Sequence, residues 1–193
     1  MHTLFETYLR SRTDLPLEAI QQISNLAVKR TLRRNEYLFN AGEVCRHKVF
    51  VLSGMLRTFS TTADGNEHIL NFSAENGWTL DPESYDRETP SLVSIGAVEP
   101  SEILCWAKAD FIALLDQLPQ FKKFSEQIIA SNIYYNRQRI LKGLSSTPEE
   151  KYEGFVQEFP DYLSRLPLRM IAAYLGISLK TLTRIRHAQL QRH

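Results

Sequence analysis

The sequence predicts an α+β protein with three parts in chain order: an N-terminal antiparallel β-barrel or jelly roll with flanking helices, a long dimerisation helix, and a C-terminal all-α helix-turn-helix domain. Short β-rich segments separated by Gly, Asp, Asn and Pro fill the chain from Val28 to Trp106, without crossover helices between them. Apolar residues then recur at helical spacing from Phe121 to Leu144. Two short helical patterns around one glycine follow near the C-terminus.

The composition indicates a folded protein that does not enter a membrane. Of the 193 residues, 43% are hydrophobic and 23% are charged, which is ordinary for a globular protein. The longest nearly apolar run, Met170–Ile177, is too short to span a bilayer, and the N-terminus lacks the pattern of a signal peptide. The two cysteines, Cys45 and Cys105, lie far apart and have no Cys or His at metal-ligand spacing. We therefore expect a cytoplasmic protein with reduced thiols, no bound metal and no membrane partner.

Helical patterns come first along the chain, and strand patterns follow them. The apolar faces of two predicted helices are Leu4, Phe5, Tyr8 and Leu9, then Leu17, Ile20, Ile23 and Leu26. The predicted strands are His47–Ser53, Met55–Thr62, Glu67–Ser73, Leu92–Val98 and Ile103–Trp106. A strong hairpin signal joins the second strand to the third, namely Ala63-Asp64-Gly65-Asn66.

The long helix predicted over Phe121–Leu144 has an apolar stripe that polar residues interrupt. Such a helix can pack back on the β-domain or pair with its copy in a second subunit, where a polar residue fixes the register. We favour the homodimer, and its predicted contact residues are Ile129, Ile133, Asn136 and Ile140. Thr147 and Pro148 then suit an N-cap and a first helical position, which marks a domain boundary. The predicted domains are an effector domain at 1–117, the dimerisation helix and hinge at 118–145, and the helix-turn-helix domain at 146–193.

Charge is distributed unevenly, although the net charge is only +1. The segment from Tyr162 to His193 has six basic residues and no Asp or Glu, which leaves 17 basic and 22 acidic residues before it. A basic terminal segment on an acidic body indicates a polyanionic partner, so nucleic acid is favoured over a merely solvated helical face.

The residues from Leu166 to His187 have the pattern of a helix-turn-helix. A first helix is predicted over Leu168–Tyr174. Gly176 suits the sharp turn after it, because glycine adopts a positive φ without steric cost. Ser178 is the predicted N-cap of a second helix. The residues predicted to pack inward from the two helices are Met170, Ile171, Ala173, Leu182 and Ile185.

The second helix is predicted to enter the major groove of double-stranded DNA with its N-terminal end. Lys and Arg there can donate to guanine O6 and N7, and Leu179 can contact a thymine methyl group. Ser178, Thr181 and the helix N-terminus suit backbone phosphates, as does Arg169 on the first helix. The candidate DNA-binding residues are Arg169, Ser178, Leu179, Lys180, Thr181, Thr183, Arg184 and Arg186. The alternative is an ordinary helical hairpin that closes a core, which the glycine turn, the serine cap and the basic outward residues together disfavour.

Residues 148–187, PEEKYEGFVQEFPDYLSRLPLRMIAAYLGISLKTLTRIRH, resemble the C-terminal domain of the Crp–Fnr superfamily of transcription regulators, most of all its short members from Bacteroidetes. Gly42-Glu43 and the later run Phe50-Val51-Leu52-Ser53-Gly54-Met55-Leu56-Arg57 are similar to the family's early barrel motif. The resemblance covers nearly the whole chain. It implies a cyclic-nucleotide-binding-type barrel, a long dimerisation helix and a winged helix-turn-helix, in that order. The sequence stops just after the second helix of the motif, so the family's β-wing is not expected here.

In nucleotide-binding members of this family, a Gly-Glu pair and an Arg followed by Ser or Thr hold the ribose and the cyclic phosphate. The corresponding positions of this chain are occupied by Leu80, Asp81, Pro90 and Ser91. Without the guanidinium, a desolvated phosphate loses its main countercharge. The nearby Arg87 is flanked by Asp86 and Glu88, which repel an anion. We therefore expect no binding of cyclic AMP or cyclic GMP, and another small-molecule effector stays open.

Aromatic residues of the β-region are candidates for lining a pocket, although core packing is the stronger interpretation. These residues are Phe72, Trp78, Tyr85 and Trp106.

Two other classes of protein fit the sequence less well. A cupin-type enzyme shares the β-architecture but needs several converging ligands, and only His47 and His68 lie in the β-region. The sequence motifs of serine hydrolases, phosphate-loop proteins and zinc proteases are missing, so we do not expect an enzyme. A ligand-sensing or protein-interaction module that has lost DNA binding is the remaining alternative.

The hypothesis from the sequence is thus a dimeric, sequence-specific transcription regulator, controlled by an unidentified signal at a degenerate cyclic-nucleotide-binding-type domain. Two copies would present their second helices to successive major grooves, about 34–36 Å apart on a palindromic operator. An event in the barrel would change the spacing of the two helices. RNA polymerase is considered as a further partner.

Overall fold

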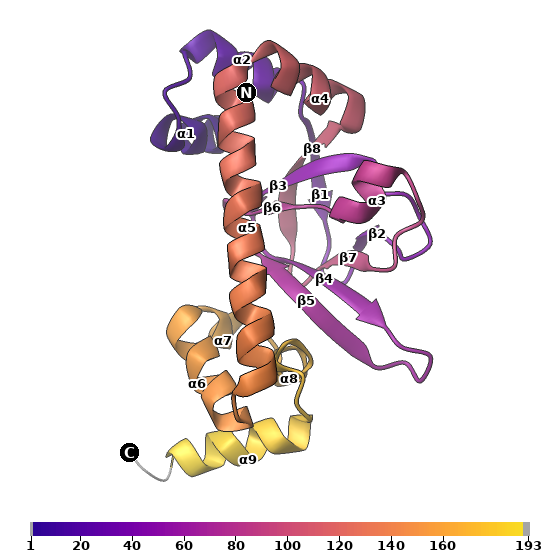
Figure 1. Cartoon of the computed structure of the whole chain (residues 1–193), viewed down its shortest axis with the longest axis vertical. Coiled ribbons are helices and arrows are strands. Elements are labelled where there is room, and N and C mark those ends of the chain that lie inside the picture. The colour runs from indigo at the N-terminus through magenta and orange to yellow at the C-terminus, as the bar shows by residue number, and fades with distance from the viewer. Residues whose placement is uncertain (1, 191–193) are drawn as a thin grey trace. The chain divides into compact units, whose positions relative to one another are not determined.

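The computed structural model describes residues 2–190, which form two compact units (Figure 1). The first unit comprises the chain up to Ser60 together with Asn71–Ala130, and the second comprises Thr61–Leu70 together with the chain from Ser131. A β-hairpin and the long helix therefore each pass from one unit into the other. The functional boundaries at 117 and 145 stay a prediction.

The β-strands form two four-stranded sheets. The first sheet contains, in spatial order, β1 (Val28–Leu32), β8 (Ser101–Ala107), β3 (His47–Ser53) and β6 (Trp78–Thr79). The second contains β2 (Tyr37–Phe39), β7 (Ser94–Ala97), β4 (Leu56–Thr61) and β5 (Glu67–Ser73). Neighbouring strands run antiparallel, as β8 does beside β3 and β7 beside β4. The predicted α+β class is confirmed, and of the two predicted forms of the β-domain the structure has the two-sheet jelly roll rather than a closed barrel.

The strands β3 and β5 have the bounds that the sequence predicts, and β4, β7 and β8 differ from their predicted ranges by a few residues. The structure adds β1, β2, β6 and the helix α3 (Pro82–Arg87), which the sequence did not predict one by one. In β1, only Leu32 is buried, so the strand lacks the alternation that identifies a half-buried strand.

Apolar side chains fill the space between the two sheets, and this cluster includes Leu32, Val49, Val51, Leu56, Ile95, Ala97, Ile103 and Cys105. The turn between β3 and β4 depends on Gly54, whose φ is +87°. A Cβ there would lie 2.3 Å from Ser101 Oγ and 2.5 Å from the Pro100 carbonyl oxygen, so only glycine fits.

Helices cover the outer face of the first sheet. They are α1 (Thr3–Arg12), α2 (Leu17–Asn25), α4 (Lys108–Gln117) and the first turns of α5 (Pro119–Ser145). The Trp106 indole nitrogen donates to the Ile23 carbonyl at 2.8 Å. The predicted inward faces of α1 and α2 are confirmed at Phe5, Leu9, Ile20 and Ile23, whereas Leu4 and Leu17, at the helix starts, and Leu26, just beyond the end of α2, are exposed.

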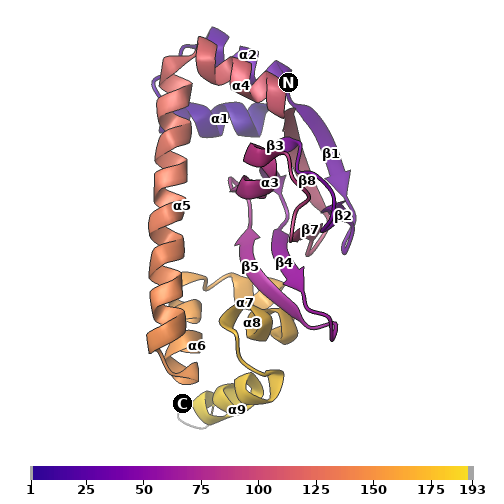
Figure 2. The same cartoon turned by 45° about the vertical axis from the view of Figure 1, so that its right-hand side comes forward.

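The second unit is mainly helical. Its helices are the part of α5 from Ser131, α6 (Pro148–Glu158), α7 (Tyr162–Arg165), α8 (Leu168–Leu175) and α9 (Leu179–Leu190) (Figure 2). The predicted cap of α6 is confirmed as a capping box. The Glu150 N–H donates to the Thr147 hydroxyl at 3.3 Å, and the Thr147 N–H donates to the Glu150 carboxylate at 2.7 Å. Among residues 2–190, none of the helices has the length and hydropathy that a membrane crossing requires.

Candidate nucleic-acid interface

Helices α8 and α9 are joined by a tight turn at Gly176, as the sequence predicts. Gly176 adopts a left-handed conformation with φ +66°, and the Ile177 N–H reaches back to the Ala172 carbonyl at 3.1 Å. This pairing satisfies a helix-end carbonyl and reverses the chain within two residues. Ser178 then accepts the Thr181 N–H at 3.0 Å, which confirms the predicted N-cap of α9.

A small apolar core fixes the two helices against each other. Leu182 is fully buried and Ile185 is 3% exposed, so both inward predictions on α9 are confirmed. On α8, Met170 and Ile171 are buried as predicted, but the prediction for Ala173 is wrong, because Ala172 is the buried alanine and Ala173 is only half-buried. At 100° per residue, Ala172 lies beside Ile171 on the helix, whereas Ala173 is turned away by two steps.

The candidate DNA-binding side chains lie on the surface of this motif. Arg169, Ser178, Leu179, Lys180 and Arg184 are exposed, and Thr181, Thr183 and Arg186 are half-buried. The three hydroxyl groups already make local bonds: Ser178 and Thr181 share one at 2.8 Å, and Thr183 donates to the Leu179 carbonyl at 2.9 Å. The cationic side chains are therefore the groups most free to reach DNA. Helix α9 also presents its N-terminus, whose partial positive charge attracts anions.

One contact in this region was not predicted. The Arg184 guanidinium lies 3.1 Å from Glu149 Oε1, in the first turn of α6, and both side chains are largely exposed. The sequence places these residues 35 positions apart, so no local pattern indicates the pair. An exposed pair of this kind is weak, and it leaves Arg184 available to a phosphate or a base at a small cost.

The cassette Leu80–Ser91 is closed on itself through Asp81. One oxygen of this carboxylate accepts the Glu83 N–H at 3.2 Å and caps α3, and the other lies 2.6 Å from the Ser91 hydroxyl. The Val93 N–H also donates to that hydroxyl, at 3.0 Å. The two side chains that match the family's sugar and phosphate ligands therefore already hydrogen-bond each other and the local backbone.

The remaining cassette residues provide no cation directed at this site. Arg87 makes an exposed ion pair with Glu83 at 3.0 Å, one helical turn away. Pro90 stands exposed where the family has its arginine, and Leu80 is half-buried. Glu88 lies 2.9 Å from Lys108 Nζ, and this contact lowers the pKa of the Glu88 carboxyl.

The candidate pocket aromatics are mostly packing residues. Trp106 is fully buried, and the Trp78 ring lies against the rings of Trp106 and Phe50, at 5.4 and 5.1 Å between centroids. Phe72 is also buried. Burial raises the pKa of Tyr85 to about 12. Core packing is thus the better interpretation of the two tryptophans. Within the described residues, no group of three or more His, Cys, Asp or Glu side chains is placed to hold a metal ion.

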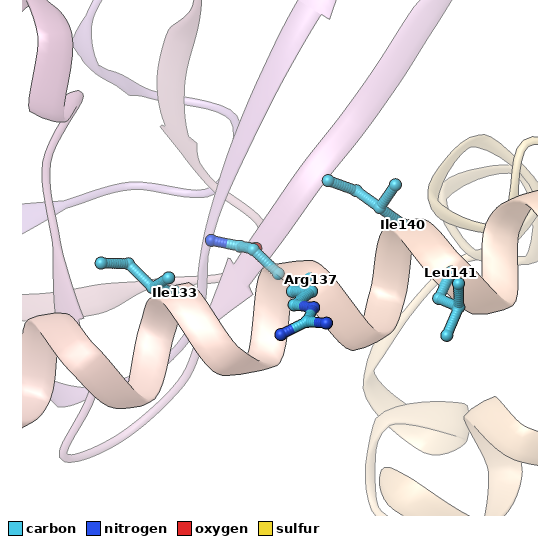
Figure 3. A pocket seen from close by; sticks show the side chains of 5 residues that line it. Ile133, Arg137, Ile140 and Leu141 are labelled. Atoms are coloured by element: carbon cyan, nitrogen blue, oxygen red, sulfur yellow. The ribbon is translucent and has the colours of Figure 1, made fainter.

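The C-terminal half of helix α5, from about Ile129, exposes an apolar face. Ile129, Ile133 and Ile140 are between 50% and 64% exposed, and Asn136 lies between them on the same side. Together with Arg137 and Leu141, residues 133, 136 and 140 line a shallow groove of about 450 Å³ (Figure 3). This face lies on residues 129–144, after the turns of α5 that pack in the first unit.

Comparisons with known proteins agree with this architecture. Residues 29–118 match the family described as the cyclic nucleotide-binding domain. The chain is 27% identical over 171 residues to the transcriptional activator protein FnrA of Stutzerimonas stutzeri, a match that covers 81% of this chain and 68% of that protein. It is 26% identical over 174 residues, with the same coverage, to the transcriptional activator protein anr of Pseudomonas aeruginosa.

Solved structures share the fold at low sequence identity. FixK2 from Bradyrhizobium japonicum superposes with a TM-score of 0.76 at 16% identity, covering 86% of this chain and 85% of that one. The c-di-GMP responsive global regulator CLP of Xanthomonas campestris gives a TM-score of 0.76 at 11% identity and 92% coverage of both chains. With its two-sheet domain, long helix and helix-turn-helix in this order, the chain is similar in sequence and fold to transcription regulators of the Crp–Fnr superfamily.

Proposed function

We propose that this protein is a homodimeric, sequence-specific DNA-binding regulator of transcription that does not respond to cyclic AMP or cyclic GMP. The observation that supports DNA reading most directly is the arrangement of α8 and α9. A tight glycine turn and a serine cap lead into a helix whose exposed cations, Lys180 and Arg184, stand at its N-terminal half. A helix presented in this way fits the major groove, where Lys and Arg read guanine.

The exposed face of α5 supports the homodimer. Monomeric proteins rarely leave a row of large apolar side chains on one helix face in water. Ile129, Ile133, Asn136 and Ile140 recur at intervals of four, three and four residues, which is the seam spacing of a two-helix coiled coil. A single asparagine in such a seam fixes the register of the pair at some cost in stability. The proposed partner is therefore a second copy of this helix.

The geometry of the cassette supports the absence of a nucleotide response. A cyclic phosphate would have to displace the Asp81–Ser91 hydrogen bond without a guanidinium in place of Pro90. It would also lie close to the Asp81 carboxylate. The lost hydrogen bond and the repulsion between the two anions both oppose binding. A signal that acts on the first unit would therefore be of another kind. Cytoplasmic location and contact with RNA polymerase belong to the same proposal, as properties expected of a bacterial regulator.

The experiment that tests the function is selection of bound duplexes from a random DNA library at near-physiological salt. The wild type is compared with a Lys180→Ala/Arg184→Ala variant and with a matched control, Lys122→Ala/Lys123→Ala, which removes two exposed cations from α5. We expect wild type and control to enrich one palindrome with half-sites one helical turn apart, and the reader variant to lose it. No enrichment, or equal enrichment by all three proteins, would favour the interaction module instead.

A further inference from the structure

The side chain of Arg139, on α5, connects three segments that lie far apart in the sequence. Its guanidinium donates through Nη1 to the Leu70 carbonyl, and through Nη2 to the Ile69 carbonyl at 3.0 Å and the Tyr174 carbonyl at 3.2 Å. Its planar head also lies over the Tyr174 ring, 4.0 Å from the centroid. Only arginine has a rigid fork of five donors that can serve three carbonyls while stacking on an aromatic face.

A second residue of α5 holds the same tyrosine. Tyr135 lies one helical turn before Arg139, on the same face, and its hydroxyl is 2.7 Å from the Tyr174 hydroxyl. Burial raises the pKa values of both phenols, so both stay protonated and one can donate to the other. The Tyr174 ring packs further against Phe155 of α6, at 5.6 Å between centroids. Tyr174 is thus fixed at its carbonyl, its ring and its hydroxyl.

The position of Tyr174 gives these contacts their significance. Tyr174 is the penultimate residue of α8, and the last carbonyls of a helix have no amide partner within the helix. Arg139 satisfies one of them and places a cation at the negative end of the helix dipole. Gly176 and Ser178 follow directly and start α9, so the end of α8 sets the direction in which α9 begins.

The other two carbonyls belong to β5, which the second unit shares with the first. The residues of β5 from Glu67 to Leu70 are part of the second unit, and its residues from Asn71 to Ser73 are part of the first. A shift of this strand would pull on the same guanidinium that holds α8.

We propose that Arg139 and Tyr135 are positioning residues that hold the end of α8, and through it the DNA-reading helix α9, in register with strand β5. The inference rests on the proposed function, because the helix that they position is the proposed reader. We name the contacts of Arg139 and Tyr135 with residues 69, 70 and 174 the Arg139 clasp.

The first test of the clasp uses the full-length protein without DNA. Hydrogen exchange of backbone amides 175–182 is compared in wild type, Arg139→Gln, Arg139→Lys and Tyr135→Phe. Lys123→Gln is the matched control, because it removes an exposed cation from the same helix. We expect Arg139→Gln to accelerate exchange in this segment at least tenfold relative to the control. Arg139→Lys should restore it only in part, since lysine has the charge without the fork, and Tyr135→Phe should have a smaller effect in the same direction.

The second test measures the ratio of affinities for the selected operator and for random duplex. If the Arg139 clasp only stabilised the fold, its loss would leave this ratio unchanged at temperatures where the protein is folded. We expect Arg139→Gln to lower the ratio at least tenfold and Lys123→Gln to leave it unchanged. The clasp would be overturned if Arg139→Gln matched the control in two measurements: the exchange rates of amides 175–182, and the ratio of operator affinity to random-duplex affinity. If the wild type selects no operator, the proposed function fails, and the exchange measurement alone decides whether the clasp holds α8.

Discussion

The cassette of the first unit and the helix-turn-helix of the second unit differ in how far their polar side chains are engaged in contacts within the protein. In the cassette, the Asp81 carboxylate caps α3 and accepts a hydrogen bond from the Ser91 hydroxyl. In the helix-turn-helix, Lys180 and Arg169 extend from the surface, and Arg184 makes an exposed ion pair with Glu149. Polar groups that satisfy each other stabilise a fold, whereas groups left at the surface are available to a ligand. We therefore expect DNA to be recognised by the second unit.

The largest expected effect comes from the exposed face of α5. The double variant Ile133→Glu/Ile140→Glu should abolish the proposed dimer, because the charges would have to be buried in the seam. Loss of the linked second reader should then weaken operator binding about a hundredfold or more. Sedimentation equilibrium and fluorescence anisotropy measure the two effects. Leu4→Glu, at an equally exposed apolar residue of α1, is the control and should change neither. A dimeric double variant would show that the copies pair elsewhere.

A change of Asp81 to Ala tests the structural role of the cassette. It removes the cap of α3 and leaves the Ser91 hydroxyl without this acceptor, so we expect the free energy of unfolding to fall by about 2 kcal/mol. Denaturant unfolding measures this loss. Operator affinity measured below the melting temperature should stay the same. A variant that keeps its stability but loses operator affinity would place a ligand function at Asp81.

The largely buried Lys48 offers a test through pH. Its ammonium lies 5.7 Å from the centroid of the Trp78 ring, and burial lowers the pKa of Lys48 from 10.5 to about 8. Between these two values the unfolded chain binds more protons than the folded one, so stability should rise as the pH increases from 8 to 10. At pH 7 both states are charged and the full cost of burial is present. Lys48→Met should therefore stabilise the fold by about 1–2 kcal/mol at pH 7, and by less at pH 10.

Thermal or denaturant unfolding at several pH values measures this difference. Lys123→Met, at an exposed site of α5, is the control and should show little effect at any pH. A loss of stability in Lys48→Met that does not depend on pH would show that the contacts of the ammonium with the rings outweigh the cost of burial.

Two glycines of the second unit provide a matched pair of substitutions by alanine, which should change the stability in opposite directions. Neither Gly176 nor Gly154 has an atom within 4 Å of an added Cβ, so only the backbone conformation differs. Gly176→Ala should lower stability by about 1 kcal/mol because its φ is +66°. Gly154→Ala, inside α6, should raise it by up to about 1 kcal/mol through helix propensity. If thermal unfolding showed that both variants gain stability or both lose it, the turn described for the helix-turn-helix would be contradicted.

The smallest effect concerns the ion pair of Arg184. Glu149→Gln should release the guanidinium and raise operator affinity about twofold, since an exposed pair is worth only a few tenths of a kcal/mol. Anisotropy at several salt concentrations measures this gain, with Glu153→Gln on the same helix as the control. A decrease in affinity would mean that Glu149 orients Arg184 for DNA rather than competing with it.

Much of the architecture could be predicted from the sequence because its signals are local. The hairpin turn at Gly65, the cap at Thr147 and the turn at Gly176 each depend on neighbouring residues alone. The inward position of Ala172 was missed because two adjacent alanines are equivalent in a hydrophobic pattern. The strand β1 was not predicted from the sequence because its place in the sheet depends on partner residues in β8 that lie 69 to 77 positions away in the chain.

The candidate site shows the same division. The outward cations of α9 could be found from helical periodicity, and the departures from the family's cassette could be found by residue type. The pair of Arg184 with Glu149, the bond of Asp81 with Ser91 and the contacts of Arg139 could not, because each joins residues at least ten positions apart. Side-chain contacts of this kind are set by tertiary packing rather than by local sequence.

The regulator that we propose recognises DNA through its second unit, without a cyclic nucleotide in the first. The most direct test is a titration of the selected operator by fluorescence anisotropy, with and without millimolar cyclic AMP. We expect the same operator affinity in both titrations and loss of binding in Lys180→Ala/Arg184→Ala. A tenfold change of operator affinity with cyclic AMP would contradict this proposal, and so would operator binding by the variant.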